Sequence, residues 1–270
     1  MRLYQTGGLD FLRRLDTIHI PEYKAKPDFI QEPMARFDYV GFGPELADQP
    51  ELRKALSLSL DYKQLKKLLY ALGRPGCPSL APRLLAKIPC YNFNLKTARQ
   101  ALQKVGAKIR SKRWSIYYSQ MGGPDVAKTI EWMQNQWKVN LGLKIDMKPQ
   151  EQGVYLGKLR YFPPALFKKG VGVDRPTCLA AAEVFESSYP ENFIRLKSKK
   201  YDRLIRLMRA DLRHKYSKSN CTKAVSFLLD HYLIIPMGQI HFTMLATGKF
   251  TGWRLNELNQ LDLSSLERVK

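Results

Sequence analysis

The sequence predicts an α/β fold, and three observations lead to this prediction. Residues 114–147 contain a strand pattern, a helix pattern and a second strand pattern within about 35 residues, the length of a βαβ unit. Of the 270 residues, 44% are hydrophobic, which is enough to bury one large core or two smaller ones. No run reaches the roughly 18 uncharged apolar residues that a membrane-spanning helix needs. We therefore expect a globular α/β protein.

The first third of the chain predicts one strand followed by two helices. Residues 1–49 are rich in loop-forming prolines, and within them residues 37–42 alternate as a strand. A helix-start signal at residues 48–51 and a cap at Asp61 predict two helices. Residues 73–93 are rich in proline, so we expect them to be irregular.

The middle of the chain predicts strands alternating with helices. Asn94 is placed to cap a helix that Gly106 closes. Residues 114–118 alternate as a strand, the next helix ends at Gly142, and residues 143–147 alternate again. The apolar face of that central helix carries Val126, Ile130, Met133 and Trp137. Because a crossover helix joins parallel strands, we expect a parallel pair with this face buried against the sheet.

The last part of the chain continues the same alternation. We expect, in order, a helix at 151–159, a strand at 165–173, helices at 199–212 and 218–230, and a strand at 233–240 that Pro236 interrupts.

The motifs of common enzyme classes are absent from the sequence. It contains no GxGxxG, GxxxxGK[ST], GxSxG or HExxH pattern. The four histidines show no metal-ligand spacing with cysteine: His19, His214, His231 and His241. We therefore expect no enzymatic activity, no metal and no cofactor.

The four cysteines leave two interpretations open. Cys77 and Cys90 bracket a proline-rich segment and could form one disulfide, and Cys178 and Cys221 could form a second. Buried free thiols are equally compatible with the sequence, since the redox compartment cannot be inferred from these residues.

The charge of the chain is strongly positive, with 45 Lys and Arg against 24 Asp and Glu. Residues 96–113 carry seven basic residues and no acid, and residues 195–223 carry eleven basic residues. Such stretches could contact nucleic-acid phosphates. Most of these charges fall on the outer positions of predicted amphipathic helices, so we favour solvated helix faces over a nucleic-acid interface.

Several short stretches of sequence form an ordered series. The first stretch is Tyr39-Val40-Gly41-Phe42-Gly43, followed by Leu52–Asp61, and the second is Tyr91–Asn94, followed by Ala98–Gly106. The third is the unit 114–147, which contains Trp137. The fourth is Val171-Gly172-Val173-Asp174, followed by Tyr201–Ile205, and the last is Ile235-Pro236-Met237, followed by Gly252-Trp253. This series resembles the later part of the family-5 extracellular solute-binding proteins, the periplasmic peptide-binding subunits of ABC importers.

The resemblance implies a periplasmic-binding-protein-like lobe of type II. It implies three parts: a partial first lobe with hinge at 1–90, an α/β substrate-binding lobe at 91–231, and a return segment to the first lobe at 232–270. Family members are longer, so we expect a truncated form that lacks the N-terminal lobe sequence. The implied location is periplasmic. The N-terminus has no apolar secretory segment, so a chain complete as written would be cytoplasmic.

The resemblance also implies ligand-binding residues. Asp174 matches the family acid that receives the α-ammonium of a peptide, and Gly172 and Val173 directly precede it. Gln120 stands where dipeptide-binding relatives carry an arginine for the peptide carboxylate, and Val171 replaces the family tryptophan. We expect Asp174, Gln120, Val173 and Gly172 to contact the ligand.

These observations predict the substrate-binding component, or a truncated remnant, of a peptide-type ABC importer. Its partners would be a peptide or other small solute and the permease subunits, and we do not expect nucleic acid. Without a first lobe, strands 37–42 and 232–240 would have unpaired edges, favouring a missing N-terminal half or self-association. The alternative is a basic scaffold or nucleic-acid-binding module without a transport role.

Overall fold

The structure is a computed structural model that describes residues 1–78, 89–175, 177–211 and 217–269. Its helices are α1 (Arg2–Gln5), α2 (Ile20–Tyr23), α3 (Pro50–Leu58), α4 (Tyr62–Leu68), α5 (Leu95–Gln103), α6 (Ala107–Arg110), α7 (Gly123–Leu141), α8 (Gln152–Tyr161), α9 (Cys178–Ala182), α10 (Lys199–Ala210) and α11 (Ser217–Asp230). Its strands are β1 (Phe11–Leu12), β2 (Phe29–Phe42), β3 (Leu72–Pro75), β4 (Trp114–Ser119), β5 (Ile145–Gln150), β6 (Leu166–Gly172), β7 (Ile234–Ala246), β8 (Phe250–Thr251), β9 (Arg254–Leu255), β10 (Leu261–Asp262) and β11 (Glu267–Arg268).

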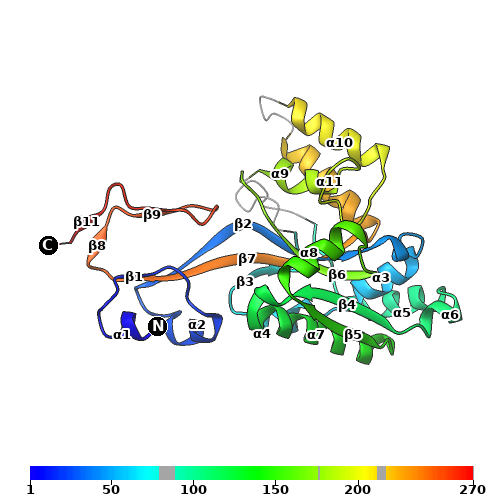
Figure 1. Cartoon of the computed structure of the whole chain (residues 1–270), viewed down its shortest axis with the longest axis horizontal. Coiled ribbons are helices and arrows are strands. Elements are labelled where there is room, and N and C mark those ends of the chain that lie inside the picture. Colours follow the sequence, from blue (N-terminus) through cyan, green and yellow to red (C-terminus); the bar gives the residue numbers. More distant parts are fainter. Residues whose placement is uncertain (79–88, 176, 212–216, 270) are drawn as a thin grey trace.

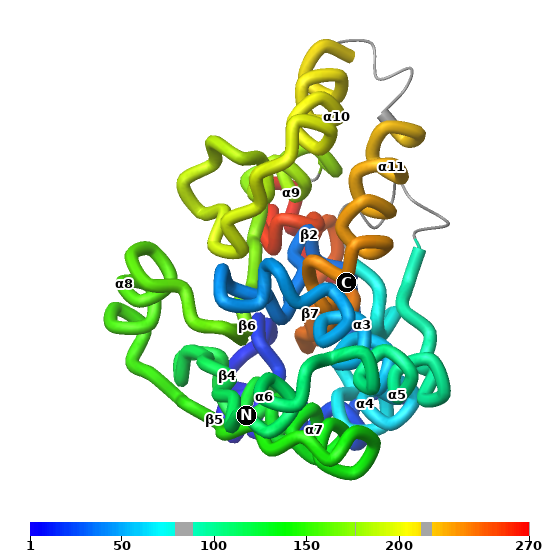
Figure 2. The backbone as a smooth tube through the Cα atoms, turned by 90° about the vertical axis from the view of Figure 1, so that its right-hand side faces the viewer, coloured from blue at the N-terminus to red at the C-terminus, as the bar shows by residue number. Residues whose placement is uncertain are grey.

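One mixed sheet organises the molecule. Its strand order is β1-β7-β2-β6-β4-β5, and β3 also pairs with β7. β4 runs parallel to β5 and β6, whereas β2 runs antiparallel to β6 and β7. Figures 1 and 2 show α10 and α11 on one side of this sheet and α7 on the other. The α/β prediction is confirmed.

The predicted strand–helix–strand unit is present as expected. β4 and β5 pair in parallel register from Trp114 opposite Ile145 to Ser119 opposite Gln150. α7 ends at Gly142, whose φ of 71° is the left-handed conformation that glycine adopts at helix ends. On its inner face Ile130, Met133 and Trp137 are fully buried, and Val126 is half-buried.

Side-chain caps start two helices as their sequences suggest. The carboxylate of Asp61 accepts from Lys63 N–H at the start of α4, and the side chain of Asn94 accepts from Thr97 N–H at the start of α5. The predicted helix stop at Gly106 is wrong. α5 ends at Gln103, and Gly106 has extended backbone at φ −57° and ψ 145°, where it precedes the short helix α6.

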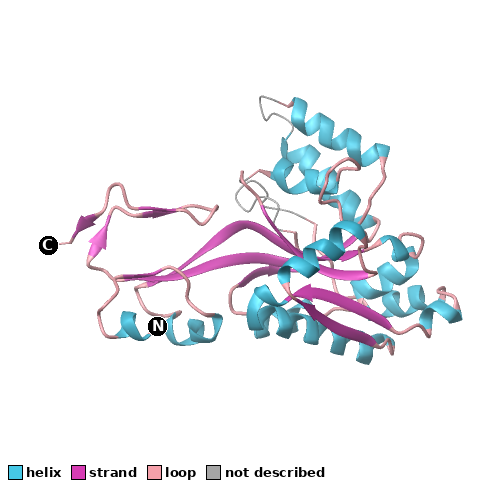
Figure 3. Ribbon diagram, viewed as in Figure 1, coloured by secondary structure: helices cyan, strands magenta, loops and turns pink. Residues whose placement is uncertain are grey.

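Strands β2 and β7 are longer than the sequence pattern indicates, with 14 and 13 residues. Figure 3 shows them as two long arrows that leave the helical part and reach the terminal segments. Pro236 does not interrupt β7, because it lies opposite Tyr39 where the register shifts between Asp38 and Tyr39. A bulge tolerates a residue that has no N–H to donate.

The expectation of unpaired edges at 37–42 and 232–240 is wrong. β2 lies between β7 and β6, and β7 lies between β2 and the strands β1 and β3. Phe37, Val40 and Ile235 are fully buried. Within the described part of the chain, residues 37–42 of β2 are therefore paired on both sides, and β7 has strand neighbours on both sides over part of its length.

The main core crosses the boundary expected at residue 90. One continuous hydrophobic cluster runs from Phe37 to Met237 and includes α3, α4, α5 and α7 side chains. The terminal segments form two smaller clusters around the distal half of β7. Tyr4, Leu15, Ile20 and Tyr23 pack on Leu245, while Phe11 and Trp253 pack against Phe242, Met244 and Ala246. The structure thus has a large α/β body and a small body built from both ends of the chain.

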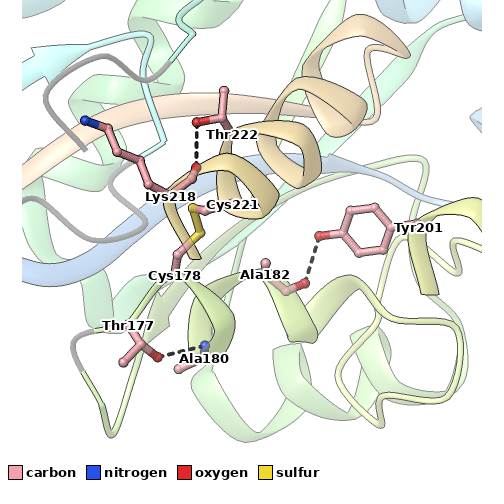
Figure 4. The surroundings of a disulfide bond; sticks show 8 residues. All are labelled: Thr177, Cys178, Ala180, Ala182, Tyr201, Lys218, Cys221 and Thr222. Atoms are coloured by element: carbon pink, nitrogen blue, oxygen red, sulfur yellow. Dashed lines mark hydrogen bonds between the residues drawn. A yellow bond between two sulfur atoms is a disulfide. The ribbon is translucent and has the colours of Figure 1, made fainter. Parts of the chain in front are cut away.

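Two disulfides settle the question that the sequence left open. Cys77 is joined to Cys90, and Cys178 is joined to Cys221. Figure 4 shows the second disulfide tying α9 to α11, with Tyr201 of α10 donating to the carbonyl of Ala182 at 2.8 Å. The three helices are therefore held together as one layer over the sheet.

Candidate functional site: a cleft at the carboxyl edge of the parallel strands

A cavity of about 600 Å³ lies at the carboxyl edge of the parallel strands. Ser119 ends β4 and Gly172 ends β6, and both line the cavity. Parallel neighbours end at the same edge of a sheet, and this edge is where α/β sheets usually bind ligands. The antiparallel strands β2 and β7 continue past it and contribute Arg36 and Thr243. The cavity volume falls within the range of small-molecule sites.

The walls of the cavity combine apolar and charged side chains. The apolar contribution comes from α4, β3, α7, α8 and β7, with Leu65, Leu69, Leu72, Val126, Leu156, Met237 and Phe242. On the far side, Arg14, Thr17 and Asn259 come from the small body at the chain ends. The cavity is therefore bounded by both bodies, and its wall offers both apolar surface and polar anchors to a ligand.

A cluster of three charged side chains lies on the β2 and β6 part of the wall. Asp38 and Lys168 are buried and form an ion pair, and Arg36 Nε donates to Asp38 Oδ1 at 2.9 Å. Burial alone raises the pKa of Asp38, but the neighbouring Lys168 and Arg36 cations outweigh this effect and hold its pKa at about 2. Asp38 is therefore a carboxylate at any physiological pH.

Gly170 makes room for this charged cluster. It is the cross-strand partner of Asp38 in the β2–β6 ladder. A Cβ atom at this position would lie 2.6 Å from both Arg36 Nη2 and Asp38 Oδ1. A larger residue would push the end of one of these two side chains aside, so glycine leaves room for both in their present positions.

Two further titratable groups face the cavity. Burial lowers the pKa of Lys169, whose Nζ donates to the carbonyl of Gly170 at 3.1 Å and lies 3.8 Å from Glu191 Oε2. Burial also lowers the pKa of His241, which favours the neutral imidazole. Within the described ranges, the Nδ1 atom of His241 has no hydrogen-bond partner.

The structure places the predicted ligand residues near this edge but not all in the cavity wall. Gly172 lines the cavity, whereas Gln120, Val173 and Asp174 are not among its lining residues. Gln120 follows β4 and is exposed. Val173 donates its N–H to the carbonyl of Ala35 at 3.3 Å.

Asp174 lies two residues beyond the end of β6, on the protein surface. Its side chain is 80% exposed, and one carboxylate oxygen is 3.3 Å from Arg175 Nε. The carboxylate can therefore reach solvent, but its role as partner of a ligand ammonium stays a prediction.

Sequence reasoning missed the cluster of Arg36, Asp38 and Lys168. One signal was available. Arg36 and Asp38 are separated by two positions at the start of an apolar strand pattern, so they lie on one face of that strand. Charged residues inside an otherwise buried strand are uncommon and mark either an ion pair or a ligand contact.

No metal centre or membrane span emerges from the part of the chain that the structure describes. There, no group of three or more His, Cys, Asp or Glu side chains could hold a metal ion. No described helix has both the length and the apolar character needed to cross a bilayer.

Comparisons with known proteins point to one family. The model of the bacterial extracellular solute-binding proteins, family 5, matches residues 1–177. The oligopeptide-binding protein OppA of Bacillus subtilis is 28% identical over 175 residues, which cover 59% of this chain and 32% of that protein.

Solved structures are similar over the whole chain. HbpA2 from Haemophilus parasuis superposes with a TM-score of 0.84 at 18% identity, covering 100% of this chain and 56% of that one. Haemophilus influenzae OppA in complex with the peptide RPPGFSPFR gives a TM-score of 0.78 at 18% identity, again covering 100% and 56%. The chain thus spans a little over half the length of these structures, and they show the periplasmic-binding-protein fold.

Proposed function

The chain belongs to the bacterial extracellular solute-binding proteins of family 5, and on this premise we propose that its cleft captures peptides or similar small solutes for an ABC importer. The observation that carries the proposal is the position of the cleft. It lies at the carboxyl edge of β4 and β6, and its wall combines apolar side chains with several charged and polar ones. The peptide bound by the relative from Haemophilus influenzae supports the same class of ligand.

Capture would be non-covalent. Peptide backbone groups would pair with strand edges and with ordered water, while apolar walls and water accept varied side chains. Asp174 would bind the peptide ammonium, with Gln120, Val173 and Gly172 beside it. The relevant location would be extracytoplasmic, as for the family, and the permease subunits would be the protein partners.

The two long strands supply the connection between the two bodies. The main core already contains residues 37–72, so we propose that the lobe boundaries lie inside β2 and β7 rather than at residues 90 and 231. Residues 1–28 and 247–269 would then belong to the first lobe, and closure would bend the β2–β7 pair.

We expect this chain alone to bind peptides more weakly than micromolar. A tight small-molecule site encloses most of the ligand surface. The small body contributes only a few residues to the cavity wall, including Arg14, Thr17 and Asn259. Micromolar affinity, about −8 kcal/mol, measured calorimetrically for a monodisperse monomer would contradict this expectation.

The proposal itself is tested by a nuclear magnetic resonance titration of the isotope-labelled chain with a mixture of di- to pentapeptides. Saturable shifts of the backbone amide signals of Ser119, Gly170 and Gly172 are expected. The amide of Gly106, on a distant loop between α5 and α6, serves as the control and should not move. The absence of any saturable shift in the cleft would contradict the proposal.

The alternative of a nucleic-acid-binding or scaffold role derives from the net charge of +21. Several basic side chains on the surface already form ion pairs within the chain: Lys112 pairs with Glu45, and Arg113 pairs with Asp146. Retention of the chain on immobilised DNA at physiological salt, together with no response to peptides, would favour that alternative.

A further inference from the structure

The basic residues of segment 96–113 gather at one end of the molecule. Figure 1 shows α5 and α6 at the end of the large body that points away from the small body. All seven Lys and Arg side chains of this segment are exposed, and the segment contains no acid. Lys112 and Arg113 directly precede β4, and the exposed Lys144 directly precedes β5. Because β4 and β5 are parallel, these residues share the amino edge of the sheet, opposite to the cleft. We call these eight basic side chains the basic end.

The basic end keeps most of its positive charge. Three of its cations form ion pairs with acids of neighbouring segments. The five without an ion-pair partner in the described part of the chain are Lys96, Arg99, Lys108, Arg110 and Lys144. A surface with an excess of one sign of charge attracts the opposite sign over about 10 Å at 0.1 M salt.

A depression of about 350 Å³ distinguishes the basic end from an ordinary solvated helix face. Arg99 of α5 and Arg110 of α6 both line it. The Nε atom of Arg99 donates to the carbonyl of Asn140 near the end of α7 at 3.0 Å, which orders this side chain. Within the described ranges, its two Nη groups donate to no protein acceptor and stay available. The planar fork of arginine matches the oxygens of a phosphate group.

The other walls of the depression favour a lipid surface over nucleic acid. Leu102, Leu141 and Val139 line it, and Val139 is 65% exposed. Basic side chains beside exposed apolar ones are typical of surfaces that lie at the boundary of headgroups and acyl chains. Residues 94–113 and 138–144 contain no aromatic residue on which a base could stack. A protein of an extracellular family also meets membranes rather than nucleic acid.

We propose that the basic end docks the protein on an anionic lipid surface, with Arg99 and Arg110 receiving a phosphate headgroup. The cleft lies at the opposite edge of the sheet, so it stays open to ligand while the protein is docked. Docking would hold the protein beside a membrane. The inference goes beyond the proposed capture of peptides and does not depend on it.

The test is flotation of the whole chain with lipid vesicles. One set of vesicles contains phosphatidylcholine alone, and the other contains equal parts of phosphatidylcholine and phosphatidylglycerol. The chain should float with the anionic vesicles at low salt and not with the neutral ones. Binding should be lost at 1 M salt, where electrostatic attraction reaches only about 3 Å.

Two double variants remove the same charge from different faces. Lys108→Gln with Arg110→Gln takes two unpaired cations from α6 and should weaken vesicle binding roughly thirtyfold, since each cation near a charged membrane contributes about fivefold. Lys199→Gln with Arg203→Gln is the matched control, because both side chains are exposed on α10. This control should keep its affinity within about twofold. Both variants should show the circular dichroism spectrum and the peptide-induced cleft shifts of the wild-type chain.

Three outcomes would overturn the inference. Equal binding to neutral and anionic vesicles, or no binding to either, would refute docking, and the peptide titration would remain a separate test of the proposed function. Equal affinities of the two folded double variants would show that the basic end has no special role. Retention on a DNA duplex without vesicle binding would assign the basic end to nucleic acid instead.

Discussion

Replacement of Trp137 by alanine is the perturbation that tests the packing of the βαβ unit most severely. Trp137 of α7 is fully buried in the main core, and its Nε1 donates to the carbonyl of Leu56 in α3 at 3.0 Å. Removing a buried tryptophan side chain costs about 3–5 kcal/mol through lost apolar burial and the cavity left behind. The hydrogen bond contributes less, because the hydroxyl of Ser59 also donates to the Leu56 carbonyl.

The magnitude is checked by urea unfolding followed by circular dichroism, since removal of a tryptophan alters the fluorescence signal. Trp137→Ala should lower the free energy of unfolding by about 3–5 kcal/mol. Trp137→Phe, which keeps most of the apolar surface, should cost about 1–2 kcal/mol. Val139→Ala on the exposed face of the same helix is the control and should change stability by less than about 0.5 kcal/mol. A cost below about 1 kcal/mol for Trp137→Ala would refute the placement of α7.

Three further predictions concern the site and the stability of the fold. Asp174→Asn should weaken binding of peptides with a free N-terminus but not of N-acetylated ones, and equal weakening of both in titrations would remove its role as ammonium partner. The pKa of Asp38 is held at about 2, below the ordinary 3.8, so its charge stabilises the fold above about pH 4 and this contribution is lost as the pH falls towards 2. In acid titrations of stability, the wild-type chain should therefore lose about 2 kcal/mol more over this interval than Asp38→Asn, and parallel curves would contradict the ion pair. The disulfide between Cys178 and Cys221 closes a loop with a sequence separation of 43 residues. Replacing both cysteines by alanine should therefore lower the free energy of unfolding by about 3–4 kcal/mol, measured by thermal unfolding. An unchanged unfolding transition would show that this disulfide does not stabilise the fold.

The sequence was most informative where local periodicity alone specifies the structure. The segment 114–147 formed the expected parallel unit because each of its strands alternates and its helix has a clear apolar face ending at Gly142. The helix stop at Gly106 failed for a physical reason. Glycine marks a stop only in the left-handed conformation, and Gly106 instead has a negative φ.

The pairing of strands that lie far apart in the sequence could not be predicted from hydrophobic periodicity. The distal half of β2 contains Pro33 and charged residues, and β7 contains Pro236, so neither reads as a long strand. Their length becomes evident only when the two strands are paired with each other across about 200 residues of sequence.

The candidate site was predicted only in outline. The segment Gly172–Asp174 was placed correctly at the end of a strand, since a strand that ends in a loop is visible in the pattern. The charged cluster was not foreseen, because Lys168 meets Asp38 only through the β2–β6 register. Nothing in the separate segments indicates that their charges meet.

The most direct test of the account places a bound peptide in the cleft. A pentapeptide carrying a spin label should broaden the backbone amide signals of Ser119, Gly170 and Gly172, which line the carboxyl edge of the parallel strands. The amides of Lys108 and Arg110 on the basic surface of α6 should stay sharp. Broadening confined to that basic surface, or no localised broadening at all, would contradict the claim that this chain carries a wall of a peptide-binding site.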